Sequence, residues 1–154
     1  MAYTSSFAQT AFGSSFSINT GTASSPVYTI IGELQSPKLT GAKNNFIEVT
    51  NLQSTQEEFI TTLSSGGNWE FTANRVTADT GQTAMQAAFT NKTKLLYKVS
   101  LPINTQVGQT TTGDAYTFQG VVETLAISDL DPKKAITLTG SIKVSGGTTF
   151  VAGS

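Results

Sequence analysis

The chain has 154 residues, enough for one domain with its own core, and only 12% of them are charged, about half the usual share. It contains no Cys and no His, which excludes disulfides and the usual zinc sites and removes the commonest general base. The formal net charge of −1 argues against general affinity for nucleic acid, because no basic excess is present to displace counterions. We therefore expect no enzyme, no cofactor and no metal.

The N-terminal region, residues 1–26, is predicted to form an arm. The first 32 residues contain no charged side chain and are rich in Ser, Thr, Gly and Ala. Such a composition is typical of a disordered tail, but the scattered aromatic residues favour an arm that orders against a neighbouring subunit. We expect Phe7, Phe12 and Phe16 to make these contacts.

Residues 148–154 are predicted to form a C-terminal tail. The N-terminus lacks the features of a signal peptide, and no apolar run has the length of a membrane span, so we expect synthesis in the cytoplasm and no membrane partner.

Most of the domain between these ends, residues 27–147, alternates between apolar and polar residues. The segment "AITLTGSIKV" places its large apolar residues on one face and Thr, Ser and Lys on the other, and "KLLYKVSL" does the same. The segment "AYTFQGVVETLAI" changes face after Gly120, which is typical of a bulge or bend. With the shorter segments "VYTII", "FIEV" and "NWEFTANRV", the pattern predicts six or seven half-buried antiparallel strands.

One segment departs from this pattern. In "TGQTAMQAAFTNK" the apolar residues recur at helical spacing, which predicts a short helix from about Gln82 to Asn91 with Thr80 as a candidate cap. The predicted fold class is therefore mainly β: an antiparallel β-sandwich or open barrel with one short helix on its side.

Two predicted loops are long, residues 50–67 and 102–114. Loops of more than about 12 residues in a compact domain are uncommon and are usually functional or disordered. The first contains adjacent carboxylates, Glu57 and Glu58, which point to opposite sides in an extended chain and do not converge on one substrate atom. A solvated acidic turn is the simpler interpretation of this pair.

Two other features could belong to a site. The pattern "SDLDP" resembles the start of a calcium loop but lacks the Gly that such a loop needs at its sixth position, so it predicts a turn. Trp69 could stack on a sugar, but a lone Trp at the start of a strand is more often part of the core.

In their order along the chain, these features resemble the major tail tube proteins of long-tailed (siphophage-type) bacteriophages. The resemblance runs from about Val27 to Gly147. It covers "FIEVTNLQSTQEEFITTLSSGGNWEF", the helix "GQTAMQAAF", the strand "LLYKVSL", and the closing pair "YTFQGVVETLAISD" and "DPKKAITLTGSIKVSG".

The resemblance implies a subunit that forms hexameric rings, which stack into a hollow tube in the virion tail after assembly in the host cytoplasm. In that family the inner strands of the subunits join into one larger barrel around the lumen, and the helix packs outside it. DNA passes through the lumen without specific binding. The implied partners are the chain itself and other tail proteins, such as the tape measure, tail tip and terminator proteins.

The resemblance also implies roles for particular residues. The loop 50–67 and both termini are expected to contact neighbouring subunits or the next ring, and Glu70 and Glu123 are candidates for lining the lumen. Candidate contact residues in the loop are Asn51, Gln53, Gln56, Glu57, Glu58 and Phe59. Alternatives are the tube of a contractile tail or injection system, and a β-sandwich that binds a surface or glycan through Trp69 and the long loops, as a decoration protein would. A carboxylate-based hydrolase is a third class, which no feature supports.

Overall fold

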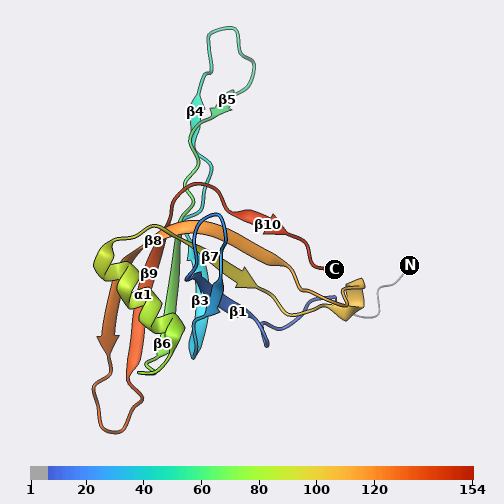
Figure 1. Cartoon of the computed structure of the whole chain (residues 1–154). Coiled ribbons are helices and arrows are strands. Elements are labelled where there is room, and N and C mark those ends of the chain that lie inside the picture. Colours follow the sequence, from blue (N-terminus) through green and yellow to red (C-terminus); the bar gives the residue numbers. More distant parts are fainter. Residues whose placement is uncertain (1–6) are drawn as a thin grey trace.

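The computed structural model describes residues 7–154 and contains an eight-stranded antiparallel sheet, a separate two-stranded hairpin and one α-helix (Figure 1). The predicted mainly β fold with one helix is confirmed. The strands are β1 (Ser15–Asn19), β2 (Tyr28–Ile30), β3 (Leu34–Thr40), β4 (Phe46–Glu48), β5 (Phe59–Thr61), β6 (Asn68–Asn74), β7 (Leu95–Ser100), β8 (Ala115–Ser128), β9 (Thr137–Val144) and β10 (Thr149–Val151). The helix α1 spans Thr80–Asn91, and a short 3-10 turn, η1, spans Thr105–Val107.

The long strand β8 joins two halves of the main sheet. The strand order is β2-β1-β7-β8-β9-β6-β3, with β10 also paired to the start of β8. The first part of β8 pairs with β7 as far as Gly120, and the second part pairs with β9. The register of β8 with β9 shifts between Val122 and Thr124, and the expected change of face occurs at this shift.

The two halves of the sheet fold over each other around an aromatic core. The rings of Phe16 (β1) and Trp69 (β6) lie 5.8 Å apart, although β7, β8 and β9 separate their strands in the sheet. Trp69 and Tyr97 each stack on Phe118, at 5.6 and 5.5 Å. Burial of each such side chain contributes roughly 1.5–3 kcal/mol, so this cluster is a main source of stability. The interpretation of Trp69 as a core residue is confirmed.

One prediction about the N-terminal arm is wrong. Phe16 is only 2% exposed and belongs to the core, because β1 is an internal strand that pairs with both β2 and β7. Its alternation of Phe16 and Ile18 places both side chains inside the sandwich. Phe16 is therefore not a contact of an arm, and residues 15–19 belong to the domain. Of the remaining residues of the predicted arm, 1–6 lie outside the described part of the chain.

The helix begins two residues earlier than expected. Asp79, rather than Thr80, caps it: the Asp79 carboxylate accepts a hydrogen bond from the main-chain nitrogen of Gln82 at 2.7 Å. The helix ends at Asn91 and is capped by Lys92, which adopts a left-handed conformation with φ of 53°. Met85 and Ala88 pack into the core, and α1 contacts β8 as well as β1 and β2 (Figure 1). No helix among residues 7–154 is long and apolar enough to cross a membrane.

The segment "FIEV" does not form a half-buried strand of the main sheet, as its alternation suggested. It forms β4, which pairs only with β5, and every residue of both strands is exposed. The resulting hairpin projects from the end of the domain at which β3 ends and β6 begins (Figure 1). The predicted loop 50–67 therefore includes an ordered strand.

Candidate functional site

One face of the β3–β6–β9–β8 half of the sheet is strongly hydrophilic, and we call it the polar face. It is opposite to the face that packs on the core. Its side chains are Lys38, Thr40, Asn68, Glu70, Thr72, Glu123, Thr124, Ser128, Thr137, Thr139, Ser141 and Lys143. Alternation along each strand places these residues outward, while Phe71, Leu138 and Ile142 from the same strands point into the core.

Two pairs of hydroxyl groups on the polar face bond to each other across neighbouring strands. The hydroxyls of Thr124 and Ser141 lie 2.9 Å apart, and those of Ser128 and Thr137 lie 2.8 Å apart. Cross-strand pairs of this kind stabilise a sheet modestly and satisfy donors that would otherwise be free to bind a ligand.

The charges of the polar face balance, with two lysines and two glutamates. The ammonium of Lys38 lies 3.3 Å from the Glu70 carboxylate. The Glu123 carboxylate accepts hydrogen bonds from the amide of Asn68 at 3.0 Å and from the hydroxyl of Ser141 at 3.3 Å. Glu70 and Glu123, the two predicted lumen residues, therefore lie on the same face. Whether this face lines a lumen stays a prediction.

This half of the sheet has a free strand edge on each side. On one side β3 is the last strand, and its pairing with β6 is interrupted by a bulge between Gln35 and Lys38 that contains Pro37. On the other side β8 loses its partner β7 after Gly120, so residues 121–128 pair with β9 alone. Free edges are sites at which a strand from another chain can pair.

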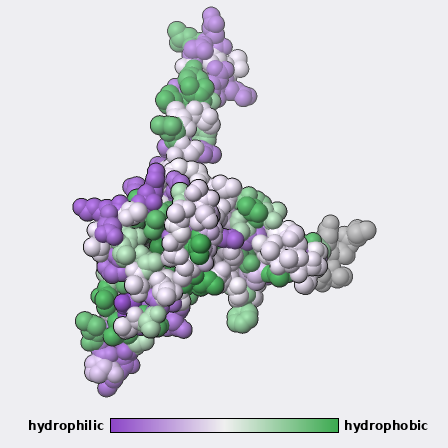
Figure 2. Space-filling model, in the orientation of Figure 1, coloured by the Kyte–Doolittle hydropathy of each residue, from purple (hydrophilic) through white to green (hydrophobic). Residues whose placement is uncertain are grey.

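The β4–β5 hairpin carries apolar side chains that are more than half exposed. They are Phe46, Ile47, Leu52, Phe59, Ile60 and Leu63. Figure 2 shows hydrophobic and hydrophilic residues interspersed along this projection. A two-stranded hairpin on its own is at best marginally stable in water, and exposed apolar surface of this kind marks an interaction site. Of these residues only Phe59 was predicted to make contacts, and Phe46 and Ile47 were missed because "FIEV" was expected to be a half-buried strand of the domain.

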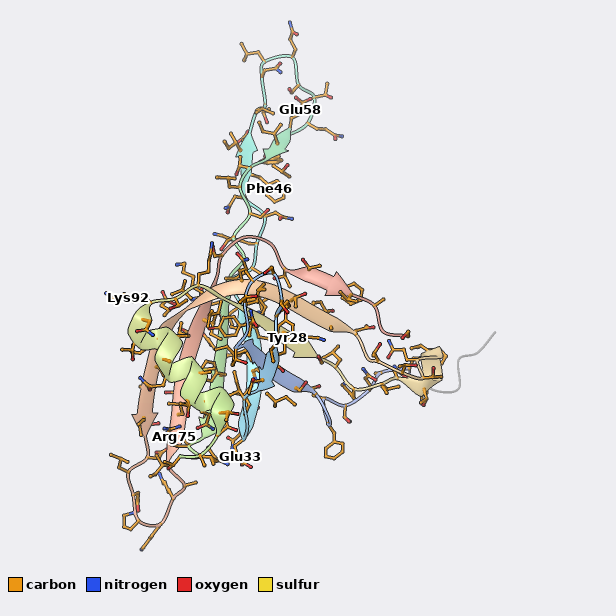
Figure 3. All side chains as sticks on the ribbon, in the orientation of Figure 1. Tyr28, Glu33, Phe46, Glu58, Arg75 and Lys92 are labelled. Atoms are coloured by element: carbon orange, nitrogen blue, oxygen red, sulfur yellow. The ribbon has the colours of Figure 1, made fainter. Side chains whose placement is uncertain are left out.

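The polar residues predicted as contacts lie at the tip of the hairpin. The Asn51 side chain accepts a hydrogen bond from the nitrogen of Gln53 at 2.9 Å, which fixes the turn, and Gln56 and Glu57 follow it, all exposed. The nitrogen of Glu58 donates to the Thr50 hydroxyl at 3.0 Å, so its side chain is free to point outward (Figure 3). Residues 7–154 contain no cluster of three or more acidic or metal-ligating side chains. The geometry of the tip suits contact with another chain and offers no convergence of carboxylates.

Two glycines set the direction of the hairpin. Gly41 comes directly after Thr40 and Gly67 directly before Asn68, the last β3–β6 pair, and their φ angles are 72° and 76°. Residues with side chains rarely adopt this conformation, and a Cβ at Gly67 would also meet the Thr40 carbonyl oxygen.

The predicted loop 102–114 and the predicted C-terminal tail are joined by hydrogen bonds. The main-chain nitrogens of Thr110, Thr111 and Thr112 all donate to the main-chain oxygen of Ser154. The nitrogen of Gly153 donates to the Asp114 carboxylate at 2.8 Å. Residues 148–154 also include β10, so this segment is part of the sheet. The Asn104 side chain donates to the oxygen of Phe7 at 3.1 Å, so both ends of the described chain meet at this loop.

No family model and no curated protein matches the sequence. Solved structures do match the fold. A chain from the tail of an empty gene transfer agent particle, solved with C6 symmetry, aligns with a TM-score of 0.71 at 14% identity over 94% of this chain and all of that one. A chain of the SPP1 tail tube gives 0.66 at 16% identity, covering 92% of this chain and 77% of that one.

Contractile systems contain similar chains as well. A chain of the PVC sheath/tube terminator, from an extracellular contractile injection system in its extended state, gives a TM-score of 0.69 at 11% identity and covers 96% of this chain and 99% of that one. These likenesses extend over nearly the whole chain. The chain therefore has the fold found in chains of phage-type tails, tail tubes and contractile injection systems.

Proposed function

We propose that the chain is a structural subunit of a hollow tail tube in a virion, which assembles from stacked rings and conducts DNA into a host cell. The observation that carries the proposal is the combination of this fold with two free sheet edges and an unpartnered apolar hairpin on the same subunit. A monomer with these features is incomplete, whereas a ring pairs the edges and a stack buries the hairpin.

Rings form when the β3 edge of one subunit meets the β8 edge, residues 121–128, of the next. Repeated around a closed ring, this contact joins the β3–β6–β9–β8 strands of the subunits into one larger barrel, for which six subunits are the expected number. The polar face then lines the lumen, with Glu70 and Glu123 among its side chains. The helix α1 lies on the opposite side of these strands and therefore on the outside of the barrel.

A lumen made of the polar face would conduct DNA without retaining it. Affinity for DNA comes largely from free cations and hydrogen-bond donors that meet phosphates. Here Lys38, one of the two lysines of the polar face, is already paired with Glu70, and four of the hydroxyls are paired with one another. The proposed role of the polar face is to conduct DNA and not to catalyse a reaction, and the proposed protein is not an enzyme.

Stacking uses the hairpin, whose tip carries Glu57 and Glu58 far from the body of the domain. The hairpin and the Glu33–Arg75 end of the domain lie at opposite poles (Figure 3), which suits contact between one ring and the next. Further partners would be the proteins that begin, fill and end a tail, such as tape measure, tail tip and terminator proteins. Assembly would take place in the host cytoplasm and the product would be part of the virion tail.

The tube of a contractile tail or injection system is the second candidate, because the similar chains come from both kinds of particle. A glycan-binding module is a weaker candidate, since the Trp69 ring is stacked on Phe118 and packs against the core.

Electron microscopy of the concentrated protein tests the proposal. The wild-type chain should form rings or tubes. Glu57→Lys combined with Glu58→Lys should leave the thermal unfolding unchanged and stop the stacking of rings, because the exposed tip would carry the opposite charge. Adding positive charge to the outer surface of α1, by Gln86→Lys and Asn91→Lys, should leave assembly unaffected. A wild-type chain that remains monomeric at every concentration, and does not add to tail fragments, would refute the proposal.

A further inference from the structure

The charges at the tip of the β4–β5 hairpin, residues 49–58, have no partner within the described part of the chain. Its two carboxylates, Glu57 and Glu58, make no side-chain hydrogen bond or ion pair with any of residues 7–154, and the tip contains no cation. Carboxylates of the described chain outside the hairpin are all engaged, as Glu70 is by the ammonium of Lys38. The tip therefore presents free negative charge to a partner outside the subunit.

Several lysines lie at the end of the domain from which the hairpin projects. Lys43 forms a bridge with Ser65 at the base of the hairpin. Lys143 pairs with Asn68 at the start of β6, and Lys92 lies at this end of α1 (Figure 3). The hairpin extends away from this end (Figure 1), so its tip points away from these cations of its own subunit. In a head-to-tail stack, the tip meets the opposite end of the next copy.

At that opposite end, Lys133 is the cation that remains free for another chain. The end carries Arg75 and the β8–β9 turn, residues 129–136 (Figure 1, Figure 3). The guanidinium of Arg75 is engaged by hydrogen bonds within the domain, and the ammonium of Lys134 lies 3.9 Å from the Asp129 carboxylate. The ammonium of Lys133 makes neither kind of contact with the residues that the structure describes.

The β8–β9 turn holds Lys133 in a defined position. The Asp131 carboxylate accepts a hydrogen bond from the main-chain nitrogen of Lys133 at 2.9 Å. The Asp129 carboxylate accepts one from the Thr137 hydroxyl at 3.0 Å. Both aspartates are thus used inside the turn, and the charges of residues 129–136 sum to zero. An ordered loop loses little conformational freedom on binding, so the turn is suited to receive a partner.

Both loops also expose a leucine. Leu130 on the turn is 79% exposed, and Leu52 on the hairpin tip is fully exposed. Ile127 and Ile136 lie on either side of the turn and are exposed as well. Figure 2 shows hydrophobic and hydrophilic residues side by side at both ends of the molecule. Exposed apolar side chains surrounded by charged ones are typical of a protein interface.

The combination of apolar and charged groups distinguishes these two loops from other exposed segments. Several segments expose apolar side chains but contain no charged residue that could pair with the tip: 7–14, 59–67, 101–113 and 148–154. The remaining charges at the end opposite the hairpin are two carboxylates, Glu33 and Asp79, against one cation, Arg75. That part of the end would repel the tip, whereas the neutral turn with its free lysine would not.

We propose that the tip of the β4–β5 hairpin binds the β8–β9 turn of a second copy of the same chain in the next ring. Glu57 and Glu58 face Lys133, and Leu52 and Leu130 are buried together between the two loops. This inference rests on the proposed stacking of rings and names the surface that receives the hairpin. The contact is heterologous, so each copy still offers a free tip or a free turn and the stack continues to grow.

An exchange of charge between the two loops tests the contact. The tip variant carries Glu57→Lys and Glu58→Lys, and the turn variant carries Lys133→Glu. Each variant alone should raise the protein concentration needed for stacking roughly tenfold or more, because like charges then meet. The two sets combined in one chain should return stacking close to the wild-type level. All of these positions are exposed, so thermal unfolding should stay at the wild-type temperature.

Two matched controls show whether the effect belongs to the turn. Lys94→Glu, just before β7 at the hairpin end of the domain, makes the same change of charge and should neither impair stacking nor rescue the tip variant. Leu130→Ala should raise the concentration needed for stacking roughly fivefold, because it removes an apolar group from the centre of the contact. Val107→Ala, at an exposed position of η1, should leave it unchanged.

Cysteine cross-linking gives an independent measurement, because the natural chain contains no Cys. Two single-cysteine variants, Glu57→Cys and Lys133→Cys, are mixed, assembled and oxidised. A disulfide between residues 57 and 133 can then form only between chains, and we expect its linked peptide in mass spectrometry. Lys94→Cys replaces Lys133→Cys in the control and should give no linked peptide with residue 57.

The outcomes separate this inference from the proposed function. Wild-type tubes without the 57–133 link, or a combined exchange that stacks no better than the tip variant, would overturn the docking of the tip on the turn and leave the tube function standing. A link between residues 57 and 94 would place the tip at the hairpin end of a neighbour and would overturn it too. A wild-type chain that forms neither rings nor tubes would overturn both.

Discussion

The ammonium group of Lys38 lies 3.3 Å from the carboxylate of Glu70, and the two side chains face each other from neighbouring strands of the polar face. Both are well exposed, so the pair contributes at most about 1 kcal/mol to folding. Its larger effect is to neutralise a cation on a face that the proposed tube presents to DNA.

Glu70→Gln should therefore change DNA retention and not stability. We expect its midpoint of urea unfolding to match the wild type, while its assembled tubes hold more labelled double-stranded DNA at low salt and release it as salt rises. Glu57→Gln makes the same change of charge on the hairpin and should leave retention at the wild-type level. Equal retention by both variants would show that Glu70 does not face the DNA path.

The buried amide of Gln82 should be one of the most sensitive positions in the domain. Its side chain is 0% exposed, accepts hydrogen bonds from Arg75 and the Val76 nitrogen, and donates to the oxygens of Gly32 and Asn74. Gln82→Ala leaves these groups without partners and opens a cavity, so we expect a loss of about 3 kcal/mol in the free energy of unfolding.

A substitution on the exposed side of the same helix provides the control for Gln82. Gln86→Ala should change the free energy of unfolding by less than about 0.5 kcal/mol. Denaturant titrations of both variants make the comparison, and equal stabilities would contradict the role of the Gln82 hydrogen bonds.

Removing the hydroxyl of Tyr97 should stabilise the protein. The side chain is fully buried and its hydroxyl has no hydrogen-bond partner among the described residues. Tyr97→Phe keeps the ring stacking on Phe118 and removes the buried polar group, so we expect a gain of about 1 kcal/mol at pH 7 by urea unfolding. The matched change Tyr28→Phe, at the sheet edge, should have little effect at that pH.

The gain from Tyr97→Phe should increase in alkali. Burial raises the pKa of Tyr97 well above its ordinary value of 10.0. Above that value the unfolded chain releases this proton while the folded chain keeps it, so the wild type loses stability as the pH rises. Tyr97→Phe lacks this loss. If the difference in free energy of unfolding between the two proteins stayed constant from pH 7 to pH 11, this would contradict a buried phenol that stays protonated in the folded chain.

Gly67→Ala should impair assembly more than folding. A Cβ at this position meets the Thr40 oxygen and forces a residue with a side chain into φ of 76°, so the hairpin must change direction. We expect a loss of about 1–2 kcal/mol in stability, measured by thermal unfolding, and no tubes in electron micrographs. Gly147→Ala, in open space, should assemble normally. Normal tubes from Gly67→Ala would show that the direction of the hairpin does not matter.

The strands and helix of the domain were predictable because their periodicity reflects a buried face. The segment 136–144 and the helix near Met85 follow this rule, and the structure confirms both. β1 was missed because its surroundings resemble a polar tail, and its place in the sheet depends on pairing with β7, about 80 residues away in the chain.

The hairpin could not be distinguished from a core strand by its pattern. Alternation in "FIEV" shows that one face of the strand is apolar, but not whether the surface that covers this face belongs to the same chain or to another copy.

For the polar face, the residues were predictable but their arrangement was not. Glu70 and Glu123 were found from their strand positions, but their convergence with Asn68 and Ser141 depends on the register of β6, β9 and β8.

The balance of charges on the polar face of each subunit has a consequence for the length of the assembly. Lys38, Lys143, Glu70 and Glu123 sum to zero on the polar face of a single chain. On the proposed placement, adding a ring adds no net charge to the lumen, so the electrostatic potential along the axis does not build up with the number of rings. The work of moving a polyanion through the interior would then grow only with local friction, and a long tail would resist transit no more strongly per ring than a short one.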